Sequence, residues 1–109
     1  MFKESVIENK KKKILEKKLR LNALSLRNKF LGEWASNILG LNEEEKLEYI
    51  KKVTSFKKNA YKFVIKKIEN DFVSNNIDIS YKEIELKIQD FQIRANVIIE
   101  NKFKINNWK

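Results

Sequence analysis

The sequence predicts an all-α fold, namely an antiparallel four-helix bundle with a flexible or extended helical arm at its N-terminus. The 109 residues include no proline and two glycines, so the chain lacks the turn residues that all-β proteins need every few positions. The same composition, nearly free of glycine and proline, favours long uninterrupted helices. The apolar residues also recur at helical spacing in stretches joined by short connections, which is typical of helices packed antiparallel around one core.

Residues 1–22 form the predicted arm. Eight lysine and arginine side chains lie here against three glutamates, and apolar residues are sparse. Lysine, glutamate and leucine are strong helix formers. Little of the segment can be buried, however, so we expect a marginal helix that stands outside the core. The remaining residues, 23–109, form the predicted bundle domain.

From residue 23 the chain has the tighter pattern of an amphipathic helix. Three apolar residues recur every seven positions: Leu24, Leu31 and Ile38. Small residues spaced by three and four form a ridge where a second helix can approach closely, and these are Gly32, Ala35 and Ser36. Gly40 is predicted to end the helix in the left-handed conformation.

Asparagines mark the limits of the next two predicted helices. Asn42 is a natural N-cap, and the three glutamates that follow it favour the positive end of a helix. This second helix is expected to end near Phe56, and Lys57-Lys58-Asn59 forms a weak break before the third. Asn75-Asn76 ends the third helix, because asparagine tolerates the left-handed conformation.

The last predicted helix begins at a capping box made by Ser80 and Glu83, and we expect it to fray after about Glu100. Apolar residues at helical spacing predict the core-facing sides of the third and last helices. These residues are Phe63, Val64, Ile68, Phe72, Ile84, Ile88, Phe91, Ala95 and Ile98.

The composition excludes several kinds of site. With no histidine and no cysteine, the chain has no means of building a usual zinc site, a disulfide or a nucleophile activated by histidine. Its carboxylate pairs fit helix capping and surface charge. We therefore expect no enzyme activity, no metal and no cofactor. No apolar run approaches the roughly 20 residues of a membrane span, and the charged N-terminus does not resemble a secretory signal.

The net charge of +9 raises the possibility of nucleic-acid binding. Lysine outnumbers arginine 21 to 3, whereas specific readout favours arginine, and Lys, Asn and Ile together make up 48 of the 109 residues. This bias favours lysines that are simply solvated on helix surfaces. A basic helical nucleic-acid-binding protein remains the alternative, through Lys10–Lys13, Lys57-Lys58 and Lys66-Lys67. A membrane-surface arm ranks third.

One segment carries a family resemblance. It consists of Arg27, Asn28, Lys29, Leu31, Gly32, Trp34 and Ala35, followed by Leu39, Gly40 and Leu41. This pattern resembles the signature of the ATPase inhibitor zeta subunit family of bacterial F1Fo-ATPase, with Phe30 in a slot that is usually aliphatic. Most of these positions are expected to be structural, since apolar residues and glycines dominate them.

The resemblance implies a non-enzymatic inhibitor of ATP hydrolysis by F1Fo-ATPase. Its arm would fold as a helix into a catalytic interface between an alpha and a beta subunit of F1 and would stop the rotor, which contains gamma. A marginal helix of this kind gains apolar contacts only on docking. Those contacts would come from Phe2, Val6, Ile7, Ile14, Leu15 and Leu19. Lys12 and Lys18 would set the orientation and the association rate.

The implied partner also predicts where the protein resides. We expect a protein that is monomeric when free, does not insert into the membrane and binds no specific nucleic acid. It would lie in a bacterial cytoplasm, in preference to a mitochondrial matrix, at the inner face of the membrane through F1.

Charge separates this chain from the family pattern in two places. The family usually carries an acidic stretch where this chain has Lys57-Lys58-Asn59, and the family arm is richer in acidic residues than one containing Lys10–Lys13 and Lys17-Lys18. Two explanations stay open: the partner surface has changed with the arm, or the protein binds differently.

Overall fold

The computed structural model describes the backbone of residues 2–56 and 60–107 and the side chains of residues 9–56 and 60–104. This part of the chain is all-helical, as predicted, and contains no strand. Four helices follow one another: α1 spans Phe2–Ile38, α2 Glu43–Thr54, α3 Tyr61–Ser74 and α4 Tyr81–Asn107. The predicted break at Lys57-Lys58-Asn59 lies outside the described residues.

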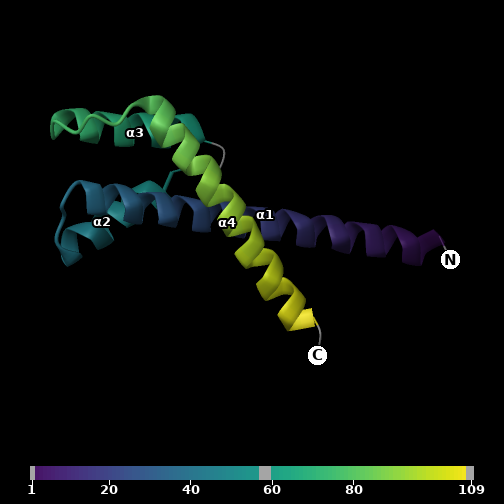
Figure 1. Cartoon of the computed structure of the whole chain (residues 1–109). Helices are drawn as coiled ribbons and strands as arrows, with labels where there is room; N and C mark the ends of the chain where they lie inside the picture. The colour runs from purple at the N-terminus through teal and green to yellow at the C-terminus, as the bar shows by residue number, and fades with distance from the viewer. Residues whose placement is uncertain (1, 57–59, 108–109) are drawn as a thin grey trace.

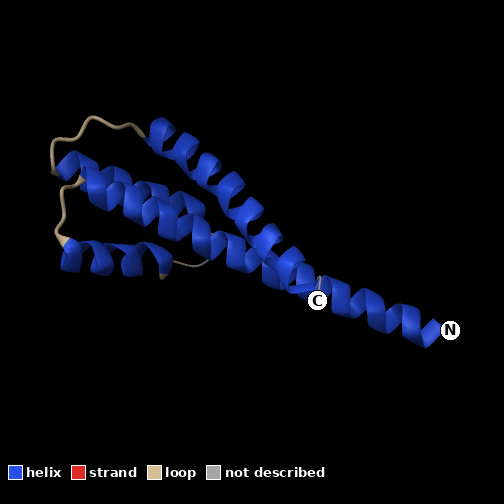
Figure 2. Ribbon diagram, turned by 60° about the horizontal axis from the view of Figure 1, so that its bottom comes forward, coloured by secondary structure: helices blue, strands red, loops and turns tan. Residues whose placement is uncertain are grey.

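The four helices alternate in direction along the chain (Figures 1 and 2). α1 and α2 form a hairpin, and α4 crosses α1 at a slant, while the N-terminal part of α1 extends beyond the other helices. The molecule measures 63 × 27 × 21 Å. Its radius of gyration of 17.3 Å exceeds the roughly 13 Å expected of a compact domain of this length. The projecting part of α1 accounts for the excess.

The main hydrophobic cluster of the described residues spans residues 31–91, and Ala23 and Ala95 are buried outside it. Its buried members are Leu31, Ala35, Tyr49, Val53, Val64, Ile65, Ile68, Phe72, Ile84, Ile88 and Phe91. All four helices contribute, and half-buried side chains such as Trp34 and Ile38 pack against the edges. Among the described residues before Leu31, Ala23, Arg27 and Asn28 are buried without joining this cluster, and residues 9–18 are all exposed, so the N-terminal part of α1 lies outside the core.

Local capping fixes the ends of the helices as the sequence predicts. The Asn42 side chain accepts a hydrogen bond from the Glu45 backbone N–H at 2.9 Å, and the Glu45 carboxylate accepts one from the Asn42 N–H at 3.1 Å. Ser80 and Glu83 form the same reciprocal pair before α4. Asn76 ends α3 with a φ of 59°, in the left-handed region.

The ridge of small residues on α1 receives α2, as predicted. A Cβ added at Gly32 would stand 3.2 Å from the Ile50 Cα and 3.5 Å from the Val53 Cβ. Ala35 and Ser36, which continue the ridge, have no exposed surface. The two backbones therefore approach so closely at Gly32 that a Cβ there would require Ile50 to shift by a few tenths of an ångström.

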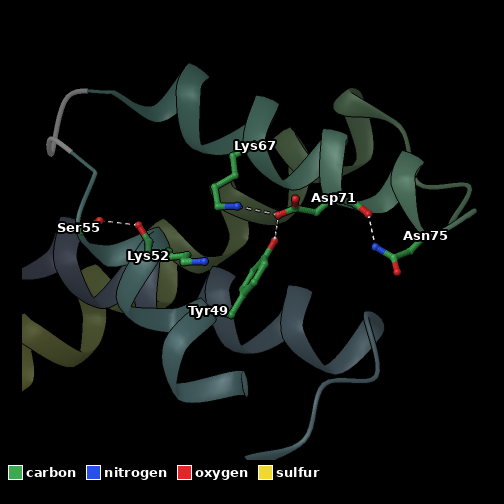
Figure 3. Close-up of polar contacts among 6 residues, drawn as sticks. All are labelled: Tyr49, Lys52, Ser55, Lys67, Asp71 and Asn75. Atoms are coloured by element: carbon green, nitrogen blue, oxygen red, sulfur yellow. Dashed lines mark hydrogen bonds and ion pairs between the residues drawn. The ribbon is translucent and has the colours of Figure 1, made fainter. Parts of the chain in front are cut away.

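A polar contact joins α2 to α3 (Figure 3). The Tyr49 hydroxyl donates a hydrogen bond to Asp71 Oδ2 at 2.8 Å, and Lys67 Nζ lies 3.0 Å from the same oxygen. The Lys67 ammonium also lies 5.3 Å from the centroid of the Tyr49 ring. Asn75 donates to the Asp71 backbone carbonyl at 2.7 Å, which closes the end of α3.

One sequence prediction about side-chain position is wrong. Phe63 was expected to face the core, yet it is 70% exposed, and Ile65 takes a buried position instead. The run Phe63-Val64-Ile65 is apolar throughout, so periodicity alone does not choose which two of the three face inward. α4 is helical to Asn107, past the point near Glu100 where the sequence predicts fraying.

The predicted boundary after residue 22 is not marked by a break in the backbone, because α1 passes through it as one helix. The division into an arm and a bundle domain stays a prediction. What changes along α1 is its burial: the described residues 9–18 are all exposed, and the first buried side chain among the described residues of the helix is Ala23.

Candidate functional site

The predicted arm presents apolar side chains to solvent. Ile14 is 69% exposed and Leu15 37% exposed, while Leu19 is half-buried. Lys12 and Lys18 are exposed beside them. At about 100° per residue, Ile14, Leu15, Lys18 and Leu19 cover roughly 140° of the helix surface, so they form one face. The side chains of Phe2, Val6 and Ile7 lie outside the described ones.

The described lysines of the arm are not neutralised by described carboxylates. The four ion pairs found among the described side chains all lie between residues 43 and 85. In contrast, Lys66 lies 3.1 Å from Glu69, and Lys67 is paired with Asp71. The basic patch that nucleic-acid binding would need on α3 is therefore partly neutralised, whereas the arm keeps its positive charge.

Residues 96–103 of α4 form a groove with the arm. The groove has a volume of about 380 Å³ and is lined by Leu15, Lys18, Leu19, Asn22, Ile99, Lys102 and Phe103. A second hollow of about 360 Å³ continues it, lined by Leu19, Arg20, Ala23, Asn96, Ile99 and Glu100. Sequence reasoning missed the contribution of α4, because nothing local links residues that are some eighty positions apart.

The first two signature residues are buried where α1 crosses α4. The Arg27 guanidinium donates to Asn28 Oδ1 through Nε at 3.1 Å and Nη2 at 3.0 Å, and to Gln92 Oε1 through Nη1 at 3.0 Å. Gln92 in turn donates to Asn96 at 3.0 Å. Burial lowers the pKa of Arg27, and the nearby Tyr61 opposes this effect. No described carboxylate forms an ion pair with Arg27.

Most other signature residues pack against the bundle. Leu31 and Ala35 belong to the core, and the Trp34 ring meets Phe72 edge-on at 5.7 Å between centroids. Leu39 and Leu41 pack against the same core as half-buried side chains. Lys29, by contrast, is exposed. The packing gives each of the apolar signature positions a structural reason that needs no partner.

Gly40 completes the signature as a helix terminator. Its φ is +70°, its N–H donates to the Asn37 carbonyl at 3.1 Å, and the Leu41 N–H donates to the Ser36 carbonyl at 3.2 Å. These two bonds form a Schellman motif, in which a left-handed residue satisfies the last carbonyls of a helix. Gly40 thereby turns the chain toward α2.

The described residues offer neither a metal site nor a membrane span. No group of three acidic side chains is arranged to hold a metal ion in the part of the chain that the structure describes. None of the described helices is both long and apolar enough to cross a membrane. The exposed face of the arm and the adjoining groove are therefore the candidate functional surface.

Comparison with known families gives one finding. A family model described as ATPase inhibitor subunit zeta matches residues 2–97, which is most of the chain. No curated protein and no solved structure matches the chain.

Proposed function

Because the chain belongs to the ATPase inhibitor subunit zeta family, we propose that it inhibits ATP hydrolysis by F1 through its N-terminal arm. Membership implies inhibition of F1Fo-ATPase and association with F1, and it agrees with the expectation that the protein is not an enzyme. The proposed mechanism is a wedge. The arm enters a catalytic interface between an alpha and a beta subunit and blocks rotation of the rotor that contains gamma.

The exposed apolar face of the arm carries this proposal. Ile14 leaves 69% of its surface in water, and the N-terminal part of α1 extends past the bundle (Figure 2). A partner that covered Ile14 and Leu15 would gain apolar burial worth about 25 cal/mol per Å². Folding of the chain itself makes little use of that area.

The shape of the molecule supports a wedge. A single helix is about 10–12 Å across with its side chains. The bundle behind it is much wider, because the shorter dimensions of the molecule are 27 and 21 Å. An interface that is wide enough for the arm is therefore too narrow for the bundle, so the protein enters it only as far as the bundle. The 13 residues Phe2–Ile14, which precede the groove shared with α4, give the arm a reach of roughly 20 Å at 1.5 Å per residue.

The charge of the arm indicates the chemistry of the receiving surface. Lys12 and Lys18 are exposed and have no described carboxylate partner. They would orient the arm and raise the association rate by meeting acidic side chains on F1. Because this arm is more basic than the family pattern, the proposal includes a matching change of charge on the F1 surface that receives the arm.

ATP hydrolysis by F1 of the same organism tests the proposal. The full chain is titrated against a truncation that begins at Asn22, and circular dichroism checks that both proteins fold. We expect inhibition by the full chain and none by the truncation. Equal inhibition by both proteins would move the activity to the bundle, and no inhibition by either would reject the proposal.

The free protein is proposed to be a monomer that meets the membrane only through F1, in a bacterial cytoplasm. Light scattering measures the mass of the free protein, and the measurement is repeated after F1 is added. A dimer in the absence of F1 would contradict this part of the proposal.

A further inference from the structure

The groove between α1 and α4 lies next to the arm and is not explained by folding of the bundle. Arg27 and Gln92 mark the place where the two helices meet. Beyond it α4 diverges from α1, and its last turns leave an angle between the two helices (Figure 1). The groove occupies this angle, between residues 15–23 of α1 and 96–103 of α4.

The groove has an apolar floor and a mainly basic rim. Leu15, Leu19 and Ile99 line it from both helices. Lys18 and Lys102 stand at its edges, together with Arg20 at the continuing hollow, while Glu100 is the acidic side chain among the lining residues. Both lysines and Arg20 are exposed. An occupant that matches this surface is apolar on one side and acidic on its flanks.

We propose that this groove receives an acidic amphipathic helix of F1, so that the docking face made by Leu15, Lys18 and Leu19 extends onto α4. This inference rests on the proposed function and adds a contact surface on α4 to the contact surface of the arm. The walls are eight and nine residues long, or about 12–13 Å at 1.5 Å per residue, so the groove accommodates roughly two turns of a third helix. Such a helix packs its apolar face on the floor and directs its carboxylates to the rim.

The apolar floor distinguishes this occupant from nucleic acid. Phosphate contacts require positive charge and gain nothing from leucine and isoleucine below it. An amphipathic helix uses both features at once. The rim charges would contribute chiefly to the orientation of the helix and to the association rate, and the floor would slow dissociation.

Charge reversal on α4 tests the groove without altering the arm. Lys102→Glu changes one exposed rim residue, and Lys62→Glu makes the same change at an exposed position of α3, outside the groove. Binding to F1 of the same organism is measured for full-length wild type and for both variants. We expect Lys102→Glu to weaken binding about fivefold or more, and the control to change it less than twofold.

Each outcome decides the inference. Equal binding by wild type and Lys102→Glu overturns it while leaving the arm mechanism intact, and so does an equal loss in both variants, which reflects overall charge. Wild type that fails to bind F1 rejects the proposed function, and this inference falls with it. A loss in Lys102→Glu that is seen with a 20-base-pair DNA duplex or anionic phospholipid vesicles, but not with F1, assigns the groove to phosphate instead.

A photoreactive residue in place of Lys102 supplies a second measurement on the full chain. Cross-linking to a helical, acid-rich segment of an F1 subunit supports the inference. Cross-linking only to the chain itself, under conditions where F1 is bound and inhibited, overturns it.

Discussion

The two halves of α1 share one continuous backbone and differ in what covers them. In the half from residue 23 onward, Leu31 and Ala35 have no exposed surface, and Gly32 brings α2 against the helix. In the first half, every described side chain from residue 9 to residue 18 is exposed. The second half is held by packing, whereas the first relies on the helix propensity of lysine, glutamate and leucine.

This difference separates folding from binding within a single helix. Residues that the core uses are not free to meet a partner, and residues that the core does not use cost little stability when they change. Ile14 and Leu15 are apolar without being buried, so under the proposed function they are available to a partner. Substitutions in the two halves should therefore affect different measurements.

The largest contrast is expected between Leu31→Ala and Ile14→Ala. Leu31→Ala leaves a cavity in the core and should lower the free energy of unfolding by about 3 kcal/mol. Ile14→Ala changes an exposed position and should stay within about 0.5 kcal/mol of wild type. Urea denaturation measures both values. Similar losses from the two variants would contradict the idea that only the second half is held by packing.

Substitutions at the two glycines of the signature should destabilise the protein for different reasons. Gly32→Val forces a branched side chain against the α2 backbone, where a Cβ alone stands 3.2 Å from the Ile50 Cα, and should cost about 2 kcal/mol or more. At Gly40 the space is open, and Gly40→Ala meets only the left-handed φ of +70°, so it should cost about 1 kcal/mol. Thermal unfolding of both variants tests this order, and a more harmful Gly40→Ala would reverse it.

Ile14→Asp should weaken inhibition of F1 about tenfold, which corresponds to about 1.4 kcal/mol, because it places a charge on the apolar face of the arm. Its stability should remain near that of wild type. Ile93→Asp is the matched control, since Ile93 is an isoleucine on α4 that is 65% exposed. Inhibition curves for the three proteins give the comparison. Equal loss in both variants would show that the effect does not belong to the arm.

How much of this arrangement the sequence predicts depends on whether the cause is local. The caps at Asn42 and Ser80 and the terminator Gly40 were predictable, because a few neighbouring residues determine each of them. The ridge at Gly32 was also predictable, since small residues at helical spacing have few other uses. The signature made the family itself accessible from sequence.

Features that depend on distant contacts were not predictable. The orientation of Phe63 depends on which side of α3 meets the core, and an unbroken apolar run leaves that choice to tertiary packing. The burial of Arg27 depends on an acceptor, Gln92, that lies 65 residues away. For the same reason, the crossing of α1 and α4 decides that Ile99 and Lys102 join the arm in one groove.

The contact between α2 and α3 gives the smallest expected effect and a distinct pH dependence. Burial raises the pKa of Tyr49, and the hydrogen bond and negative charge of Asp71 raise it further (Figure 3). The unfolded chain releases the phenol proton near pH 10, whereas the folded protein retains it. The stability that Tyr49 contributes is therefore present below about pH 10 and is lost as the pH rises above that value.

Tyr49→Phe should remove both the hydrogen bond and this dependence. Between pH 7 and 9, the variant should be less stable than wild type by about 1 kcal/mol. Above pH 10 the difference should shrink by about 1.4 kcal/mol per pH unit and change sign near pH 11. The ion pair between Lys67 and Asp71 is present in both proteins, so its contribution to stability largely cancels in the difference. Urea denaturation at each pH gives the values, and a difference that stayed constant to pH 11.5 would show that folding does not hold the Tyr49 proton.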